Sequence, residues 1–410
     1  MISDMRSFYG WRVLAAAFVL AVCGWGMGFY GPPIYLHAVR AARGWPLALV
    51  STAVTTHFLV GAIVVANLPA LYRRFGLARV TKLGGLALAV GVIGWAVATA
   101  PWQLLAATVV SGIGWALTGG ATINAIVSPW FVRTRPAALS MAYNGASIGG
   151  VVFSPLWVAA IGGLGFPAAA TVVGTVVALT IWILAERLFS HTPQQMGLAP
   201  DGDAPDAPVA PRAAKPALSA ALWRERRFLT LAAGMTIGLF VQVGLIAHLF
   251  SLLVPALGEA LAGIAMGAAT AAAIAGRTLV GWLMPPGADR RAIACVNYVV
   301  QIAGSLAFLS AAGTNVPLLV LGVLLFGVGI GNTTSLPPLI AQAEFAEADV
   351  GRVVSLIVAI SQAAYAFAPA AFGMIRELSG ANAGTMLFFA TAAVIQALAI
   401  TAFLAGRRSR

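Results

Sequence analysis

The chain has 410 residues, of which 60% are hydrophobic and only 9% charged, whereas soluble domains carry about 25% charged residues. This composition excludes a soluble globular protein, and apolar stretches of about 20 residues, long enough to cross a lipid bilayer as helices, recur along the chain. The net charge of +12 could indicate nucleic-acid binding, but the positive residues lie in short loops between these stretches, so no polyanionic partner is needed to explain them.

The apolar stretches predict twelve membrane-spanning helices. With both termini placed in the cytoplasm, Arg40, Arg43 and Arg376 fall on the opposite side, Arg277 falls inside a span, and every other lysine and arginine is cytoplasmic. The positive-inside rule therefore favours this topology. The spans are predicted at residues 12–38, 46–70, 79–99, 102–127, 136–160, 166–187, 228–254, 260–284, 292–311, 316–341, 352–375 and 382–405.

The first span contains two adjacent prolines. Pro32 and Pro33 in YGPPIY lack backbone N–H groups. We expect them to break or kink this helix and to free carbonyl groups that can line a cavity.

The middle of the chain differs in composition from the rest. Residues 191–216 are rich in proline, alanine and aspartate and show no apolar periodicity, which predicts a disordered linker. The expected organisation is a six-helix bundle over 1–190, a cytoplasmic linker over 191–224 and a second six-helix bundle over 225–410.

The two halves share glycine and proline landmarks at almost one offset. These matches indicate a parallel internal repeat of six helices, an arrangement in which transporters bind substrate where the two repeats meet. The predicted fold is therefore an all-α membrane protein of two six-helix pseudo-repeats. The matching pairs are Gly44 with Gly258, Pro101 with Pro317, Gly112 and Gly114 with Gly327 and Gly329, and Pro155 with Pro369.

Several motifs carry a family resemblance over nearly the whole chain outside the linker. They are YGWRV (9–13), RGWPLALVSTA (43–53), PWFVRTRPAALSMAYNGASIGG (129–150) and IAHLF with AGRTLVGW (246–282). With them the chain resembles the monocarboxylate transporter and oxalate/formate antiporter branch of the major facilitator superfamily. The resemblance implies a rocker-switch carrier with a central cavity and alternating access.

The loop after the second span departs from that family. Members usually carry an aspartate-arginine pair there, whereas LYRRFG has Arg73 in the place of the acid. The family loop is associated with locking one conformation, so the resemblance implies gating roles for the basic residues of the cytoplasmic loops. The residues are Arg73, Arg74, Arg133 and Arg135. For the cluster in LYRRFG the alternative is contact with anionic lipid.

Arg277 stands inside the apolar run AAAIAGRTLVGW, and every acidic residue falls at a span end or in a loop. An arginine at the centre of a membrane helix costs about 2.5 to 3.5 kcal/mol, so it should face a cavity or a partner. A guanidinium in a water-filled cavity can hold a carboxylate by two parallel hydrogen bonds, and the resemblance implies a substrate-binding arginine at this point. The alternative is that Arg277 snorkels to the interface or bonds backbone carbonyls at a gate.

The absence of charged residues at two places limits the charge and the proton coupling that we expect for the substrate. Oxalate carriers of this branch add a lysine in the eleventh span, but residues 355–369 contain no cation. A single fixed charge favours a monoanion over a dianion. Proton-coupled members tend to carry an aspartate four residues before the arginine and a lysine in the first span, whereas this chain has Ala273 and no such lysine. We therefore do not expect proton coupling through an embedded carboxylate.

Histidines are the remaining candidates for proton-linked transport. His248 lies in the seventh span and matches a histidine frequent in bacterial members of the branch; it either lines the substrate site or is a packing residue. For His57 in the second span, packing is favoured over a proton-linked role.

Other embedded polar residues are candidate walls of the substrate site, although such residues often only join helices. The candidates are Tyr30, Ser140, Tyr143, Asn144, Ser147, Gln242, Asn332, Ser355, Gln362 and Tyr365.

The function predicted from these patterns is secondary active transport of a small organic monoanion of the monocarboxylate class, with protons as a second candidate cargo. The alternative is an efflux carrier for hydrophobic or amphipathic compounds. No enzyme, cofactor or metal site is expected, because nothing pairs an embedded nucleophile with a base and no metal-ligand spacing occurs. We expect a monomer in a bacterial inner membrane, surrounded by lipid and without a nucleic-acid partner.

Overall fold

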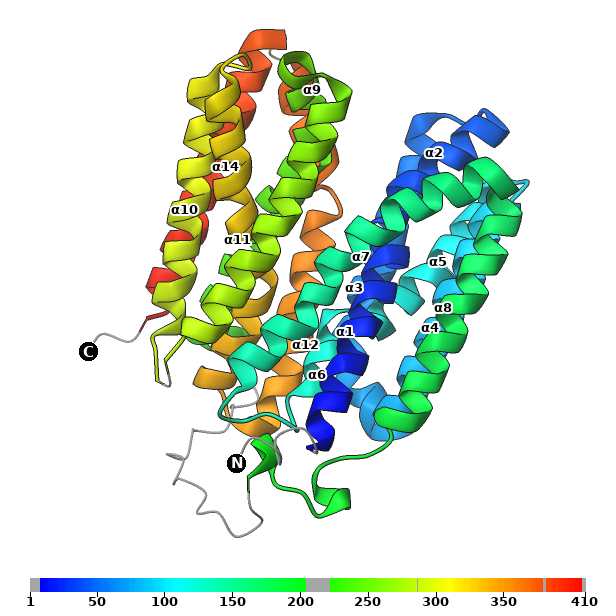
Figure 1. Cartoon of the computed structure of the whole chain (residues 1–410), viewed down its shortest axis with the longest axis vertical. Helices are drawn as coiled ribbons and strands as arrows, with labels where there is room; N and C mark the ends of the chain where they lie inside the picture. Colours follow the sequence, from blue (N-terminus) through cyan, green and yellow to red (C-terminus); the bar gives the residue numbers. More distant parts are fainter. Residues whose placement is uncertain (1–7, 204–221, 286, 379–380, 408–410) are drawn as a thin grey trace. The chain divides into compact units, whose positions relative to one another are not determined.

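The computed structural model describes residues 8–203, 222–285, 287–378 and 381–407. The chain divides into two compact units, Met1–Ala214 and Lys215–Arg410, and both are bundles of long helices (Figure 1). Within the described part, twelve segments are long and apolar enough to cross a membrane, as predicted.

The N-terminal unit is formed by eight helices, with two spans divided between two helices each. The helices are α1 (Tyr9–Gly28), α2 (Gly31–Arg43), α3 (Leu47–Phe75), α4 (Leu77–Val97), α5 (Pro101–Thr118), α6 (Gly120–Val127), α7 (Arg135–Leu164) and α8 (Phe166–Leu188). Short 3-10 turns follow at Gln194–Met196, at Pro200–Gly202 and, in the next unit, at Leu222–Arg224.

The C-terminal unit begins with a helical stretch that holds two spans. Its helices are α9 (Arg226–Leu283), α10 (Arg290–Ala311), α11 (Val316–Glu344), α12 (Glu347–Tyr365), α13 (Ala368–Leu378) and α14 (Ala381–Ala405). Within α9, Gly258 has a φ of 73°, which side chains other than glycine rarely adopt, and it separates the seventh span from the eighth.

The predicted internal repeat is visible in backbone geometry. Gly44, which ends the first span, has a φ of 65°, and its match Gly258 ends the seventh span with a φ of 73°. Glycine serves both turns because it has no Cβ to clash in the left-handed region.

The second glycine pair of the repeat has a packing role. A Cβ on Gly112 would lie 2.3 Å from the carbonyl oxygen of His57 in the second span, and a Cβ on Gly327 would lie 2.7 Å from that of Ala269 in the eighth. In each half, therefore, a glycine lets the fourth span (α5 or α11) approach the second span (α3 or the second part of α9) at backbone distance. Gly114 and Gly329 pack in the same way against the third span of their halves, which is α4 or α10.

The surface of the helices confirms that lipid is their solvent. Large apolar side chains are exposed along the spans, among them Ile63 at 67%, Trp102 at 68% and Leu283 at 71%. In water such surfaces would drive association, whereas hydrocarbon solvates them. The chain is an integral membrane protein.

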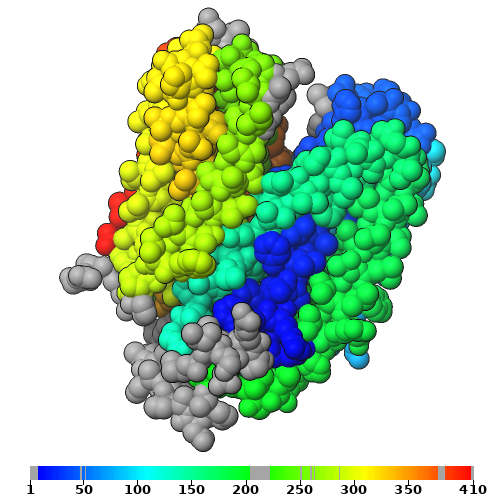
Figure 2. All heavy atoms as spheres, viewed as in Figure 1, coloured from blue at the N-terminus to red at the C-terminus, as the bar shows by residue number. Residues whose placement is uncertain are grey.

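Helix α1 is central to the N-terminal unit. Figure 2 shows its side chains between those of α7 and α8, and twelve of its twenty residues are buried. The helix breaks after Gly28, as the two prolines predict, and α2 begins at Gly31.

Candidate functional site

Arg277 lies in the second half of α9 and is only 3% exposed. Its Nε donates a hydrogen bond of 3.0 Å to the carbonyl oxygen of Gly331 in α11. This bond uses the nitrogen nearest the main chain and fixes the plane of the guanidinium. In the end-on arrangement, a guanidinium holds a carboxylate by parallel bonds from its two terminal nitrogens.

Gly331 is required for this position of Arg277. A Cβ on Gly331 would lie 2.8 Å from Arg277 Nε and 2.6 Å from the carbonyl oxygen of Ala273. Only a residue without a side chain therefore lets α11 accept the arginine here. The structure thus shows a backbone-carbonyl contact, which belonged to the alternative interpretation of Arg277, and it places that contact deep in the bundle.

Two predicted site residues of the same unit hold buried oxygens that lack a hydrogen-bond partner among the described residues. They are Oε1 of Gln242 in α9 and Oδ1 of Asn332 in α11. Asn332 directly follows the glycine that holds Arg277, and its Nδ2 donates to the carbonyl oxygen of Val328. An unpaired buried acceptor is costly, so such atoms mark places where water or a ligand donates a hydrogen bond.

His248 bonds different partners from those of Arg277. Its Nε2 lies 2.9 Å from the carbonyl oxygen of Pro369, which can only accept, so this nitrogen carries the hydrogen. Its Nδ1 then accepts from Arg376 Nη1 at 3.2 Å. Arg376 was predicted to lie outside the spans, but it belongs to α13 at the end of the eleventh span, where it contacts the embedded side chain of His248.

The eleventh span contains three of the predicted polar residues of the site. Gln362 and Tyr365 are buried, and the Tyr365 hydroxyl donates to Gln362 Oε1 at 3.4 Å. Ser355 is buried on the same helix. All three residues therefore belong to α12.

The N-terminal unit carries the other predicted wall residues. Tyr143 of α7 is buried and donates from its hydroxyl to the carbonyl oxygen of Gly120 at 2.8 Å, at the break between α5 and α6. Ser140, Asn144 and Ser147 are buried on the same helix. Tyr30 is half-buried in the connection between α1 and α2, where a Cβ on Gly150 of α7 would touch its ring.

His57 is 1% exposed, and both ring nitrogens have partners inside its unit. Nε2 lies 3.0 Å from the carbonyl oxygen of Gly28, and Nδ1 lies 2.8 Å from the Ser111 hydroxyl. These contacts agree with the packing interpretation favoured from sequence.

Residues 14–369 match the Major Facilitator Superfamily. The chain belongs to this superfamily. It is therefore a membrane transporter and not an enzyme.

Two solved superfamily structures are similar over nearly their whole length. The human organic anion transporter MFSD10 (TETRAN) has a TM-score of 0.68 and 16% identity, with 96% of this chain and 99% of that chain covered. The E. coli fucose:proton symporter FucP has a TM-score of 0.68 and 13% identity, with 97% and 100% covered. At these identities the likeness concerns the fold alone. The comparison with curated proteins found no match.

The basic residues for which gating is predicted fall into two groups. Arg73 and Arg74 are exposed at the end of α3, and the Arg74 guanidinium lies over the Phe75 ring, 5.1 Å from its centre. Arg135 donates to the carbonyl oxygens of Phe131 at 2.6 Å and Ser128 at 2.8 Å, so it holds the loop between α6 and α7 together.

Arg133 forms a two-bond ion pair with Asp203, a residue of the predicted linker, at 2.9 and 3.1 Å. Asp201 accepts from the backbone N–H groups of Val132, Arg133 and Thr134 at 2.7 to 3.1 Å, and from the Thr134 hydroxyl at 2.6 Å. The prediction of a disordered linker is thus wrong for residues 200–203, which we name the strap. Residues 204–216 of the predicted linker lie outside the described residues.

Asp201 explains why the strap docks on this loop. Burial alone would raise the pKa of Asp201, but the hydrogen bonds from Thr134, Arg133 and Val132 outweigh it and hold the pKa below its ordinary value of 3.8. Sequence did not indicate the contact, because the partners lie 67 to 69 positions apart.

Replacing Asp201 by asparagine is expected to speed hydrogen exchange of the 132–134 amides at pH 7, because the carboxylate that accepts from them is lost. The Asp203→Asn control should have a smaller effect, since its ion pair with Arg133 is largely exposed. A carboxyl group whose pKa is lowered by folding stabilises the folded state at pH values above its ordinary pKa. This stabilisation is lost as the pH falls through the pKa of the folded state. Protection in the wild type, corrected for intrinsic rates, should therefore stay constant between pH 7 and 5; equal protection in Asp201→Asn would contradict this account.

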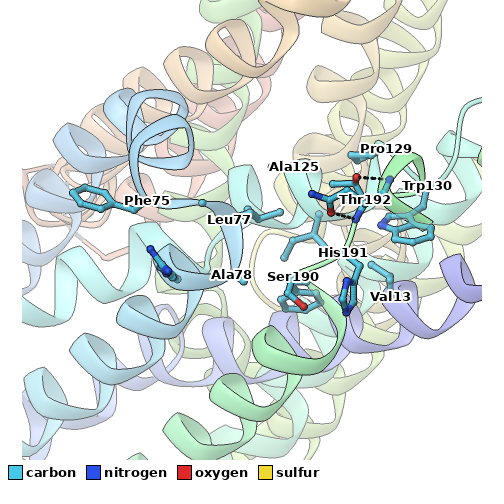
Figure 3. A pocket seen from close by; sticks show the side chains of 15 residues that line it. Val13, Phe75, Leu77, Ala78, Ala125, Pro129, Trp130, Ser190, His191 and Thr192 are labelled. Atoms are coloured by element: carbon cyan, nitrogen blue, oxygen red, sulfur yellow. Dashed lines mark hydrogen bonds between the residues drawn. The ribbon is translucent and has the colours of Figure 1, made fainter. Parts of the chain in front are cut away.

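A cavity of about 360 Å³ lies beside this loop in the N-terminal unit (Figure 3). Its wall includes Gly76 and Arg79 at the start of α4, Trp130, and His191 with Thr192 after α8. The residues that line it include none of the predicted substrate residues. It is therefore separate from the embedded polar groups described above.

Proposed function

We propose that the protein is a secondary active transporter that moves a small organic monoanion of the monocarboxylate class by alternating access. Superfamily membership supports transport. Arg277 is proposed to receive the negative charge of the cargo, with Asn332, Gln242, Gln362, Tyr365, His248, Tyr30, Tyr143 and Asn144 as further binding residues.

The observation that carries this proposal is the setting of Arg277. A guanidinium that is 3% exposed inside a membrane span is costly unless it serves binding or coupling. Its Nε is anchored to Gly331, so the side chain is oriented before any ligand arrives. An anchored planar cation suits carboxylate recognition, because less side-chain freedom is lost when the anion binds.

The unpaired oxygens of Gln242 and Asn332 add to this picture. They are acceptors, so they fit hydrogen-bond donors that accompany the anion, such as a hydroxyl group or a water molecule. A buried cation, with unpaired neutral acceptors in the same unit, fits a small polar anion better than a bulky apolar compound.

The composition of the eleventh span supports a singly charged cargo. Residues 355–369 contain no lysine or arginine, and Arg376 beyond them donates to His248. Arg277 is then the one proposed receptor charge, because Arg376 is engaged by His248, and one receptor charge favours a monoanion. His248 is the proposed proton-linked residue, and a bacterial inner membrane is the proposed location.

Uptake of labelled L-lactate into proteoliposomes tests the proposal. We expect saturable uptake that unlabelled lactate and other monocarboxylates inhibit, that oxalate inhibits less, and that uncharged lactamide does not inhibit. Equal inhibition by lactamide would contradict a charge receptor. Extrusion of lipophilic cations without lactate transport would instead support the efflux function.

A further inference from the structure

The break in the first span leaves backbone carbonyls without their usual helical partners. In a regular helix the carbonyl of Gly28 would bond the N–H of residue 32, but Pro32 has none. Tyr30 N bonds the carbonyl oxygen of Trp25, not that of Gly26, which would be its partner in a continuous α-helix.

Three side chains from three helices bond the carbonyls at this break. Trp157 Nε1 of α7 donates to Gly26 at 3.3 Å, the Tyr35 hydroxyl of α2 donates to Met27 at 3.2 Å, and His57 Nε2 of α3 donates to Gly28 at 3.0 Å. We name Tyr35, His57 and Trp157 the carbonyl clasp.

The clasp is a built feature of the core. Its three residues are at most 1% exposed, and the rings of Tyr35 and Trp157 pack edge to face with centres 4.9 Å apart. Because carbonyls deep in a membrane protein have no water to bond, each donor removes a penalty that the break would otherwise impose.

The partners of His57 determine its chemical form. A carbonyl can only accept, so Nε2 carries a hydrogen. In a neutral ring Nδ1 then accepts from the Ser111 hydroxyl at 2.8 Å, which is a shorter contact than the 3.2 Å from the same hydroxyl to the carbonyl oxygen of Thr108, while Trp95 Nε1 donates to Ser111 at 3.2 Å. These hydrogen bonds give both ring nitrogens of a neutral imidazole a partner, and a buried charge would be costly.

We propose that His57 is a positioning residue of the transporter: as a neutral hydrogen-bond donor in the carbonyl clasp, it fixes the break between α1 and α2 and thereby the orientation of α2. Fixing the break also orients Tyr30, which lies at the break and whose ring lies against Gly150. His57 is not a proton carrier in this assignment, and its role needs an N–H donor rather than a titratable group.

Hydrogen exchange of the full-length purified protein tests the assignment without knowledge of the substrate. His57→Leu removes the donor and orphans the Gly28 carbonyl, so peptides covering α2 should exchange about tenfold faster, the size expected for one buried unsatisfied group. His57→Gln places an amide N–H near the Nε2 position and cannot titrate. It should keep exchange of α2 within about twofold of wild type.

Further variants keep the test decisive. Peptides of α10 should be unchanged, which shows that the effect is local. If His57→Leu does not fold, Tyr35→Phe removes only the hydroxyl that bonds Met27 and should likewise loosen α2. Unchanged exchange of α2 in the folded donor-deleting variants, or equal acceleration in His57→Gln and His57→Leu, would overturn the assignment.

Discussion

Replacing Arg277 by glutamine is expected to abolish most lactate uptake. Truncating one partner of a buried, hydrogen-bonded charge pair costs about 2 to 5 kcal/mol, which corresponds to a loss of about thirtyfold or more in binding of the anion. Glutamine retains a polar end but has neither the charge nor the fork of donors. Arg277→Lys keeps the charge and should be intermediate, because an ammonium cannot form two parallel bonds to a carboxylate.

Two controls separate this effect from general damage. Arg352→Gln makes the same charge change at an exposed position of α12 and should leave uptake near wild type. Gly331→Ala keeps the arginine but forces its guanidinium or the neighbouring backbone to move, since the added Cβ would lie 2.8 Å from Nε. It should weaken uptake as well. Full uptake by folded Arg277→Gln would end the proposal of a charge receptor.

Replacing Glu344 by glutamine is expected to destabilise the C-terminal unit strongly. Glu344 binds Arg291 through both carboxylate oxygens at 2.6 and 2.8 Å, and the arginine side chain is 2% exposed. Arg291 also donates to the Thr230 hydroxyl and to the carbonyl oxygens of Arg227 and Phe403, so it joins α9, α10, α11 and α14. Loss of one partner of a buried pair costs about 3 to 5 kcal/mol, because the other charge stays buried.

Thermal unfolding in detergent measures this effect. Glu186→Gln is the matched control, because Glu186 pairs with Lys82 on an exposed face, where an ion pair contributes at most about 1 kcal/mol. The double variant Arg291→Met with Glu344→Leu should recover part of the loss, since it leaves no buried charge. A melting temperature of Glu344→Gln equal to that of Glu186→Gln would contradict the prediction.

The fold was largely predictable because a membrane imposes simple rules on sequence. Apolar length gave the twelve spans, and Pro32 with Pro33 marked the break between α1 and α2. The repeat was readable from glycines because each is required by a specific geometry, a left-handed turn at Gly44 and Gly258 or a close helix approach at Gly112 and Gly327.

The polar contacts were much less predictable. Nothing in the Pro-rich segment indicates that Asp201 accepts from four groups of a distant loop. The carbonyl clasp was also missed, since its donors come from three helices and their acceptors are backbone atoms. Sequence shows that Arg277 is embedded, but its anchoring to Gly331 depends on how α9 and α11 pack.

Binding of lactate to the purified protein, measured by calorimetry in the wild type and in Arg277→Gln, tests the central claim most directly. Binding isolates recognition of the anion from coupling and from the rate of the transport cycle. We expect saturable binding to the wild type that competing monocarboxylates displace, and no measurable binding to Arg277→Gln at the same concentrations. Equal affinity in the two proteins would show that the anion does not bind Arg277.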